Sequence, residues 1–428
     1  MRDTPRGTEP HDGETRDRRQ SDDAPSTVGL RRPPELQPAP DPGHEPVLLA
    51  GIVAEIQAGG PMTFARFMEL ALYHPALGYY ASGRRGPGRE GDFLTAPESH
   101  PLFGWAIARQ LEEAWDRLGR PARFTVREHG AGTGALAAGI VEGLQRAESP
   151  LLPALRYRIS ERAPDRERQV RDRLANLAAA DLLEPDDGRP IEGAVIANEV
   201  LDALPVHRVV GGPDGALLES FVGLDDTGAL TTVDGPPSTP ALRARLDVEG
   251  VRIGPRQRAE ICLAVDDWMA NTSAGLARGL LLLIDYGHPA TALYAPTRGS
   301  LLRAYVHHRV HRDPYANVGR QDLTAHVDLT AVERAARVAG LIHLGTTTQA
   351  AFLAGLGAGE LLTGLQEGPG ATLEAYLQAR SALFRMLDPS ATGAFAVLAF
   401  GRGFKAEPPI RGLAFRPPTR PQADQTLA

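Results

Sequence analysis

Residues 124–136 read FTVREHGAGTGAL, and this stretch decides the fold of the chain. Its first four residues alternate between apolar and polar side chains, as in a half-buried strand. Leu136, Ile140 and Leu144 then recur at helical spacing on one face. Between the two patterns, three glycines at alternate positions let the backbone approach a ligand closely or adopt a positive φ. The stretch therefore predicts a strand, a glycine turn that holds a small ligand, and a helix.

The glycine turn fits two classes of ligand. Gly130, Gly132 and Ala135 satisfy a loose G-x-G-x-x-G/A pattern, which would place the pyrophosphate of a dinucleotide on the helix N-terminus. Glu128 closes the strand, and its carboxylate would repel a pyrophosphate but suits the ammonium group of S-adenosylmethionine (SAM). We therefore favour SAM over a dinucleotide, with Gly134 as the third glycine of the binding turn.

Polar residues also follow three later segments that read as strands. Glu161 ends the second strand, where dinucleotide and SAM folds both use an acid to accept hydrogen bonds from a ribose diol. Asn198 and Glu199 end the next apolar strand, and Asp285 ends a further one. An open parallel sheet binds its ligands at the carboxyl ends of its strands. We therefore expect these side chains and Glu128 to converge on one crevice.

A long loop at about residues 74–98 precedes the glycine turn. It is rich in aromatic side chains and glycine, and it carries Asp92 and Glu98. A long loop in a compact domain is more often functional than not. We expect Thr95 and Glu98 to line the ligand site, although the aromatic side chains of such a loop can also serve packing alone.

Length and composition narrow the choice of protein class. With 428 residues, the chain exceeds one ordinary domain, so a core domain with sizeable additions is expected. The net charge of −7 argues against a broad surface for nucleic acid or membranes, because those surfaces need clustered cations. The sequence has no apolar run long enough to cross a bilayer and no apolar N-terminal segment of the signal-peptide kind. We expect a soluble, cytoplasmic protein that binds no nucleic acid and does not insert into membranes.

We predict no metal site. Cys262 is the only cysteine, which excludes an internal disulfide and any cysteine-based metal site. His307, His308 and His311 are poorly spaced for ligands on one helical face.

The distribution of charged, apolar and proline residues also divides the chain into regions. The first residues carry many charges and prolines with almost no large apolar side chains, which predicts a disordered tail. The last residues are rich in proline and are expected to be loose. We predict a tail at 1–46, a helical extension at 47–122, a core at 123–404 with insertions at about 207–256 and 289–330, and a loose tail at 405–428.

Eight motifs, spread in order over about residues 47–404, carry a family resemblance. They are Gly60-Pro61-Met62, Pro75-x-x-Gly78-Tyr79-Tyr80, Gly91-Asp92-Phe93-x-Thr95-x-Pro97-Glu98, Phe103-Gly104, Glu128-x-Gly130-x-Gly132-x-Gly134, Asn198-Glu199-x-x-Asp202-Ala203-Leu204-Pro205, Asp285-Tyr286-Gly287 and Gln321-Asp322-Leu323-Thr324-Ala325-His326-Val327-Asp328. Together they resemble the SAM-dependent methyltransferases of the MidA type, whose mitochondrial members assist respiratory complex I assembly. Gly139 departs from the family pattern, since a polar, often acidic residue is expected at its place in the first helix.

The resemblance implies an α/β protein with the class I SAM-dependent methyltransferase fold. This fold has a Rossmann-like, doubly wound sheet, and the family adds a helical N-terminal extension and inserted elements. The resemblance also implies SAM as the cofactor. The mitochondrial members are regarded as protein arginine methyltransferases that act on a complex I subunit.

Chemistry suggests which residues would act on an acceptor. A sulfonium is already an activated methyl donor, so the protein mainly orients the acceptor and excludes water. An arginine acceptor also needs a carboxylate to orient the guanidinium and take a proton, because the pKa of arginine lies far above neutral. Glu199 and Asp202 are the catalytic candidates; alternatively, Glu199 supports the adenosine pocket and Asp202 caps a helix.

Three functions are consistent with the sequence. The first is a protein methyltransferase directed at arginine, with a complex I subunit as a candidate acceptor. The second is a small-molecule O- or N-methyltransferase. The third is a non-catalytic assembly factor that keeps SAM as a structural ligand.

Overall fold

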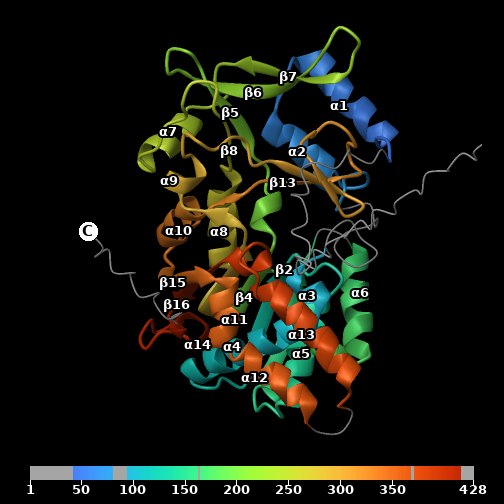
Figure 1. Ribbon diagram of the computed structural model, residues 1–428, viewed down its shortest axis with the longest axis vertical. Helices are drawn as coiled ribbons and strands as arrows, with labels where there is room; N and C mark the ends of the chain where they lie inside the picture. Colours follow the sequence, from blue (N-terminus) through green and yellow to red (C-terminus); the bar gives the residue numbers. More distant parts are fainter. Residues whose placement is uncertain (1–41, 81–93, 162–163, 368–370, 416–428) are drawn as a thin grey trace, which may run out of the picture.

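The computed structural model describes residues 42–80, 94–161, 164–367 and 371–415 (Figure 1). The tail predicted at 1–46 lies outside these residues up to Asp41, and the tail predicted at 405–428 lies outside them from Arg416 onward. Within the described part of that tail, Ile410 and Gly412 are buried, and the N–H of Gly412 donates to Oε1 of Gln110 at 3.0 Å. Asp92 of the long loop before the glycine turn also lies outside them.

A six-stranded mixed sheet forms the centre of the fold. Its strand order is β15-β16-β9-β4-β2-β3, in which β3, β2, β4 and β9 are parallel and β16 is antiparallel to both of its neighbours. Parallel neighbours place the carboxyl ends of four strands along one edge of the sheet. The strands are β2 Phe124–His129, β3 Leu155–Ser160, β4 Ile191–Asn198, β9 Leu276–Asp285, β15 Ile342–Thr348 and β16 Ala396–Arg402.

Helices cover both faces of this sheet. In β9, Leu280, Leu282 and Ile284 join the apolar cluster of α4 and α5. Leu281 and Leu283 join the cluster of α8 and α10 on the opposite face. A strand segment that is buried on both faces is apolar at successive positions, as residues 280–284 of β9 are. The covering helices are α4 Leu102–Arg117, α5 Ala135–Arg146, α8 Ala264–Ala274 and α10 Leu329–Val338.

Gly139 lies where α4 and α5 cross closely. A Cβ built on Gly139 would lie 3.1 Å from the Cα of Gly104, and one built on Gly104 would lie 2.5 Å from the carbonyl carbon of Gly139. A side chain at Gly104 would clash, and one at Gly139 would be in tighter contact than usual, so the close packing of the two helices favours glycine at both positions.

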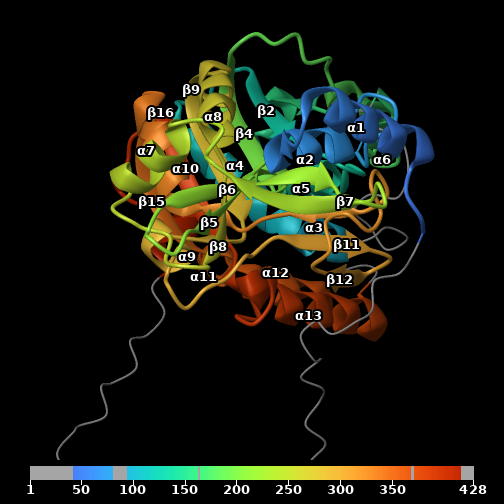
Figure 2. The ribbon, with the colours of Figure 1, turned by 90° about the horizontal axis from the view of Figure 1, so that it is seen from above.

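A second layer lies over the carboxyl edge of the central sheet (Figure 2). Met62 and Thr63 form β1, which pairs with β6, so the N-terminal segment and the predicted insertion at 207–256 share one sheet. Helices α1 and α2 pack beneath it in one apolar cluster with residues of the 289–330 segment. The layer contains α1 Pro46–Gly59, β1 Met62–Thr63, α2 Phe64–Tyr73, β5 His207–Gly211, β6 Leu217–Leu224, β7 Leu230–Gly235, β8 Arg258–Ile261, β11 Arg303–Val306, β12 Arg309–His311 and β13 Asp322–Thr324.

Further helices and strands make up the other α-helical and β-strand parts of the described chain. They are α3 Ala96–Ser99, α6 Pro164–Ala175, α7 Ala241–Val248, β10 Gly287–His288, α9 Ala290–Leu293, β14 Val327–Asp328, α11 Gln349–Gly355, α12 Ala358–Thr363, α13 Leu373–Leu387 and α14 Arg411–Ala414. No described helix is long and apolar enough to cross a membrane.

Candidate active site

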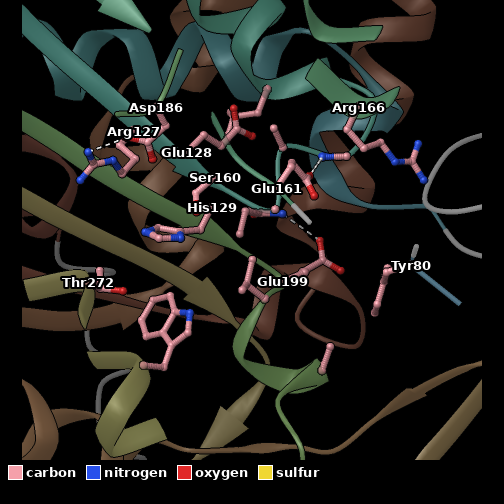
Figure 3. Close-up of a pocket in the computed structure, with 18 of the residues that line it drawn as sticks. Tyr80, Arg127, Glu128, His129, Ser160, Glu161, Arg166, Asp186, Glu199 and Thr272 are labelled. Atoms are coloured by element: carbon pink, nitrogen blue, oxygen red, sulfur yellow. Dashed lines mark hydrogen bonds and ion pairs between the residues drawn. The ribbon is translucent and has the colours of Figure 1, made fainter. Parts of the chain in front are cut away.

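A cavity of about 760 Å³ opens at the carboxyl ends of β2, β3 and β4. Small-molecule sites typically measure roughly 300–1,000 Å³. Figure 3 shows side chains from several elements turned toward this space. The predicted site residues that line it are Thr95, Glu98, Glu128, Gly130, Gly132, Glu161, Asn198 and Glu199.

The strand, glycine turn and helix predicted from residues 124–136 are all present. Gly130, Gly132 and Gly134 have φ angles of 67°, 56° and 82°, a region that residues with a Cβ rarely adopt. A Cβ on Gly130 would also lie 2.8 Å from the Cγ2 of Val200. Gly134 precedes α5 and shapes the turn without lining the cavity.

Glu161 and Glu98 both bond to the glycine turn. The backbone N–H of Gly132 donates to Oε1 of Glu161 at 2.7 Å. The hydroxyl of Thr133 donates to Glu98, whose other carboxylate oxygen lies 3.8 Å from a guanidinium nitrogen of Arg173. The two acids predicted on either side of the turn therefore hold it in place.

Glu128 lies in a different environment from the one that the sequence suggested. Its side chain is 3% exposed, and it accepts a hydrogen bond from the hydroxyl of Tyr157. Burial raises the pKa of Glu128 to about 8, and the Tyr157 bond only partly opposes this effect. At neutral pH this pKa leaves the carboxyl group mainly protonated unless a cation, such as the ammonium group of SAM, lies beside it and favours the charged form.

Glu199 projects into the cavity from the end of β4. Its φ is 53°, which is unusual for a residue with a side chain. The amide of Asn198 donates to Oε1 of Glu199 at 3.2 Å. Burial, followed by the charge of Asp202, raises the pKa of Glu199 to about 8.

Asp202 lies behind the cavity wall and does not line it. It is 5% exposed, and it accepts a hydrogen bond from the hydroxyl of Tyr286. Its other oxygen, Oδ1, has no hydrogen-bond partner among the residues that the structure describes. Burial raises the pKa of Asp202 to about 6.

The family of S-adenosyl-L-methionine-dependent methyltransferases has a model that matches residues 106–347 of this chain. The chain belongs to this family. It is a SAM-dependent methyltransferase with SAM as its cofactor, and the resemblance to the MidA type is confirmed.

Three relatives illustrate the family. The crystal structure of a Burkholderia thailandensis protein bound to S-adenosyl-homocysteine is 34% identical, with a TM-score of 0.79 over 88% of this chain and 97% of that chain. The Drosophila melanogaster protein named protein arginine methyltransferase NDUFAF7 homolog, mitochondrial, is 29% identical over 75% of this chain and 77% of its own length. The human protein arginine methyltransferase NDUFAF7, mitochondrial, is 28% identical over 74% of this chain and 75% of its own length.

These names correct one prediction. The cytoplasmic location expected from the sequence is wrong, since the curated relatives of Drosophila, rat and human are all named as mitochondrial proteins. The prediction rested on the lack of an apolar N-terminal run. Such a run marks secretion, whereas mitochondrial leaders are amphipathic and rich in arginine, so the criterion could not detect them.

Asp285 holds the turn that carries Glu199, a role that the sequence did not reveal. Its Oδ2 accepts hydrogen bonds from the backbone N–H groups of Val200, Leu201 and Asp202 at 3.2, 2.9 and 3.2 Å. The Asp285 side chain is 1% exposed. Asp285 follows the apolar strand β9, so only its place at a strand end pointed toward the site.

We expect Asp285→Ala to lower the free energy of unfolding by about 1–3 kcal/mol, because three buried N–H groups would lose their acceptor. Urea unfolding measures this loss. Asp225→Ala is the matched control, since Asp225 accepts from the N–H groups of Thr227 and Ala229 in an exposed turn, where water can replace it. An Asp285→Ala protein as stable as the parent would contradict the anchoring role.

The cavity continues beyond the predicted residues toward α8. His129 lies 5.5 Å from Trp268, ring centre to ring centre, and both line the cavity together with Thr272. Burial lowers the pKa of His129 to about 4. Arg127 also lines it and donates to Asp186 at 2.7 Å. Sequence reasoning missed these residues: Trp268 and Thr272 lie in a helix without a motif, whereas His129, at the end of β2 directly before the glycine turn, could have been found from its place at a strand end.

Proposed function

We propose that this chain transfers the methyl group of SAM to an arginine side chain of a protein. The observation that carries the proposal is Glu199, a carboxylate at the end of β4 that shares one cavity with the glycine turn. The names of the curated relatives support it, because they describe protein arginine methyltransferases. A complex I subunit is the first candidate acceptor, from the family resemblance.

The proposal also assigns the class I methyltransferase fold to the part of the chain that binds the cofactor. The parallel order β3-β2-β4-β9, continued by the antiparallel β16, supports a Rossmann-like, doubly wound sheet. The cavity fits SAM, because the positive φ angles of the glycine turn favour residues that lack a Cβ, and the backbone can then approach the ligand closely. Two buried polar atoms of residues that line the cavity, Nε2 of His129 and Oδ1 of Asn198, have no hydrogen-bond partner among the described residues. A polar ligand could bond to them.

Each predicted cofactor residue has a role in this proposal. Bound SAM would supply a methyl group on a positively charged sulfur. Gly130 and Gly132 let the backbone approach the ligand, and Glu161 accepts hydrogen bonds from the ribose diol. The remaining residues shape or support the wall: Thr95, Glu98, Glu128, Gly134 and Asn198.

In this proposal, binding and deprotonation of the acceptor depend on two carboxyl groups. Glu199 would hold the guanidinium by charge-assisted hydrogen bonds and take one proton as the guanidinium nitrogen gains the methyl group. Asp202 would act from behind the wall, where its charge raises the pKa of Glu199 and makes it a better base. Asp202 is thus a positioning residue in this proposal, not a group that touches the acceptor.

Labelled SAM tests the proposal directly. The purified protein is incubated with methyl-labelled SAM and an extract of cells that lack this chain, and the labelled products are separated by size and hydrolysed. We expect the label in methylarginine from a polypeptide. Label found only in small molecules, or only in methyllysine, would overturn the proposal.

A further inference from the structure

Two tyrosine rings, those of Tyr73 and Tyr80, form part of the cavity wall. Tyr73 ends α2, and Tyr80 follows it in the next turn; their ring centres lie 5.4 Å apart and their planes differ by 24°. Both rings line the cavity, as do Glu199 and Ala203. Figure 3 shows Tyr80 and the Glu199 carboxylate on the same side of the space.

Hydrogen bonds fix both phenols at their outer ends. The Tyr73 hydroxyl donates to the carbonyl oxygen of Ala203 at 2.9 Å. The Tyr80 hydroxyl donates to Oδ1 of Asp322 in β13 at 2.7 Å. Tyr79 adds an edge contact to Tyr80, with ring centres 5.1 Å apart. The aromatic wall is therefore rigid before any acceptor arrives.

The charges at this end of the cavity favour a cation. The ion pairs within the described part of the chain include none for Glu199, Asp202 or Asp285. Burial raises the pKa of each of these three carboxyl groups, and repulsion from neighbouring carboxylates raises it further for Glu199 and Asp285. A cation placed against Glu199 would relieve this repulsion, whereas an anion or an apolar group would not.

We propose that Tyr73, Tyr80 and Glu199 form the acceptor subsite and that this subsite selects a guanidinium over an ammonium ion. A guanidinium is planar, weakly hydrated and forked, so it stacks on aromatic rings and bonds a carboxylate through two N–H groups. An ammonium is a compact, strongly hydrated charge that gains less from such a wall. This inference rests on the proposed function and names the residues that would separate arginine from lysine.

Binding of two small cations to the full chain tests the subsite. The protein is saturated with S-adenosyl-homocysteine, and the affinities of ethylguanidinium and ethylammonium are compared by calorimetric titration. We expect ethylguanidinium to bind at least about tenfold more tightly. Equal affinities, or a preference for ethylammonium, would overturn the proposal.

Variants of Tyr80 and Tyr376 test where ethylguanidinium binds. Tyr80→Leu should lower the ethylguanidinium affinity about tenfold or more and leave the S-adenosyl-homocysteine affinity unchanged. Tyr376→Leu is the matched control, because Tyr376 is half-buried in α13 and does not line the cavity. Tyr80→Phe keeps the ring and loses the Asp322 bond, so it should retain most of the selectivity and serves where the leucine variant fails to fold. A loss of S-adenosyl-homocysteine binding in both Tyr80 variants would assign the wall to the cofactor and overturn the proposal.

Failure of this inference can be told apart from failure of the proposed function. Methylarginine in the labelling experiment, without any preference for ethylguanidinium, would leave the function and reject the subsite. Selective ethylguanidinium binding that Tyr80→Leu abolishes, without any methylarginine, would support the subsite and reject protein arginine as the acceptor.

Discussion

Gly132→Val should weaken the binding of S-adenosyl-homocysteine by at least about a hundredfold, which corresponds to about 2.7 kcal/mol. Gly132 has a φ of 56°, and its N–H donates to Glu161 at 2.7 Å. A β-branched residue in this region is strained by about 1–3 kcal/mol. Relief of that strain would turn the N–H away from Glu161 and would bring a side chain into the cavity that Gly132 lines. Calorimetric titration measures the affinity directly.

Gly119→Val separates this effect from backbone strain alone. Gly119 follows α4 with a φ of 88°, and a Cβ built there would meet no atom within 4 Å. It does not line the cavity. We expect Gly119→Val to lose stability but to bind S-adenosyl-homocysteine like the parent. If Gly132→Val also bound like the parent, the glycine turn would not hold the cofactor.

The local pattern of the sequence was sufficient to predict the ligand-binding half of the sheet. Each strand, turn and helix around the glycine turn is specified by residues close together in the chain, and parallel strands bring their carboxyl ends to one edge by geometry. Glu161, Asn198 and Glu199 therefore met in one cavity as expected. The raised pKa of Glu128 could not be predicted, because it depends on the burial of the side chain between strands, which its own position in the sequence does not show.

Contacts between distant segments could not be predicted. The aromatic wall depends on Tyr80 and Asp322, which are 242 residues apart. The strand β15 gave no signal, since its half-exposed position at the sheet edge imposes little apolar alternation. The β1–β6 pairing joins two segments that each look like independent additions in the sequence. In each case the structure of a segment depends on the distant segment that it contacts, and its own residues do not show this contact.

Glu199→Gln should lower kcat by about tenfold to a hundredfold with little effect on cofactor affinity. The amide keeps the size of the side chain but can neither pair with a guanidinium nor accept its proton. In the parent, kcat/KM should rise with pH through about 8, because burial holds the pKa of Glu199 near that value and the base must be ionised. The variant should lose this dependence. Full turnover of Glu199→Gln on a confirmed acceptor would remove Glu199 from the mechanism.

Glu199→Gln should also make the protein more stable at high pH, whereas a simple packing defect would make it less stable. The folded pKa of about 8 lies above the usual value of 4.5, so the folded parent holds a proton that the unfolded chain loses between these values. Stability of the parent therefore falls as pH rises from 4.5 to 8, and glutamine removes this loss. We expect the variant to melt at a higher temperature than the parent at pH 9 and at a similar temperature at pH 4. Glu192→Gln is the control, because Glu192 forms an exposed ion pair with Arg278 at the other end of β4 and should show neither effect. A Glu199→Gln protein that is less stable at pH 9 would mean that the lost rate reflects damaged packing and not a missing base.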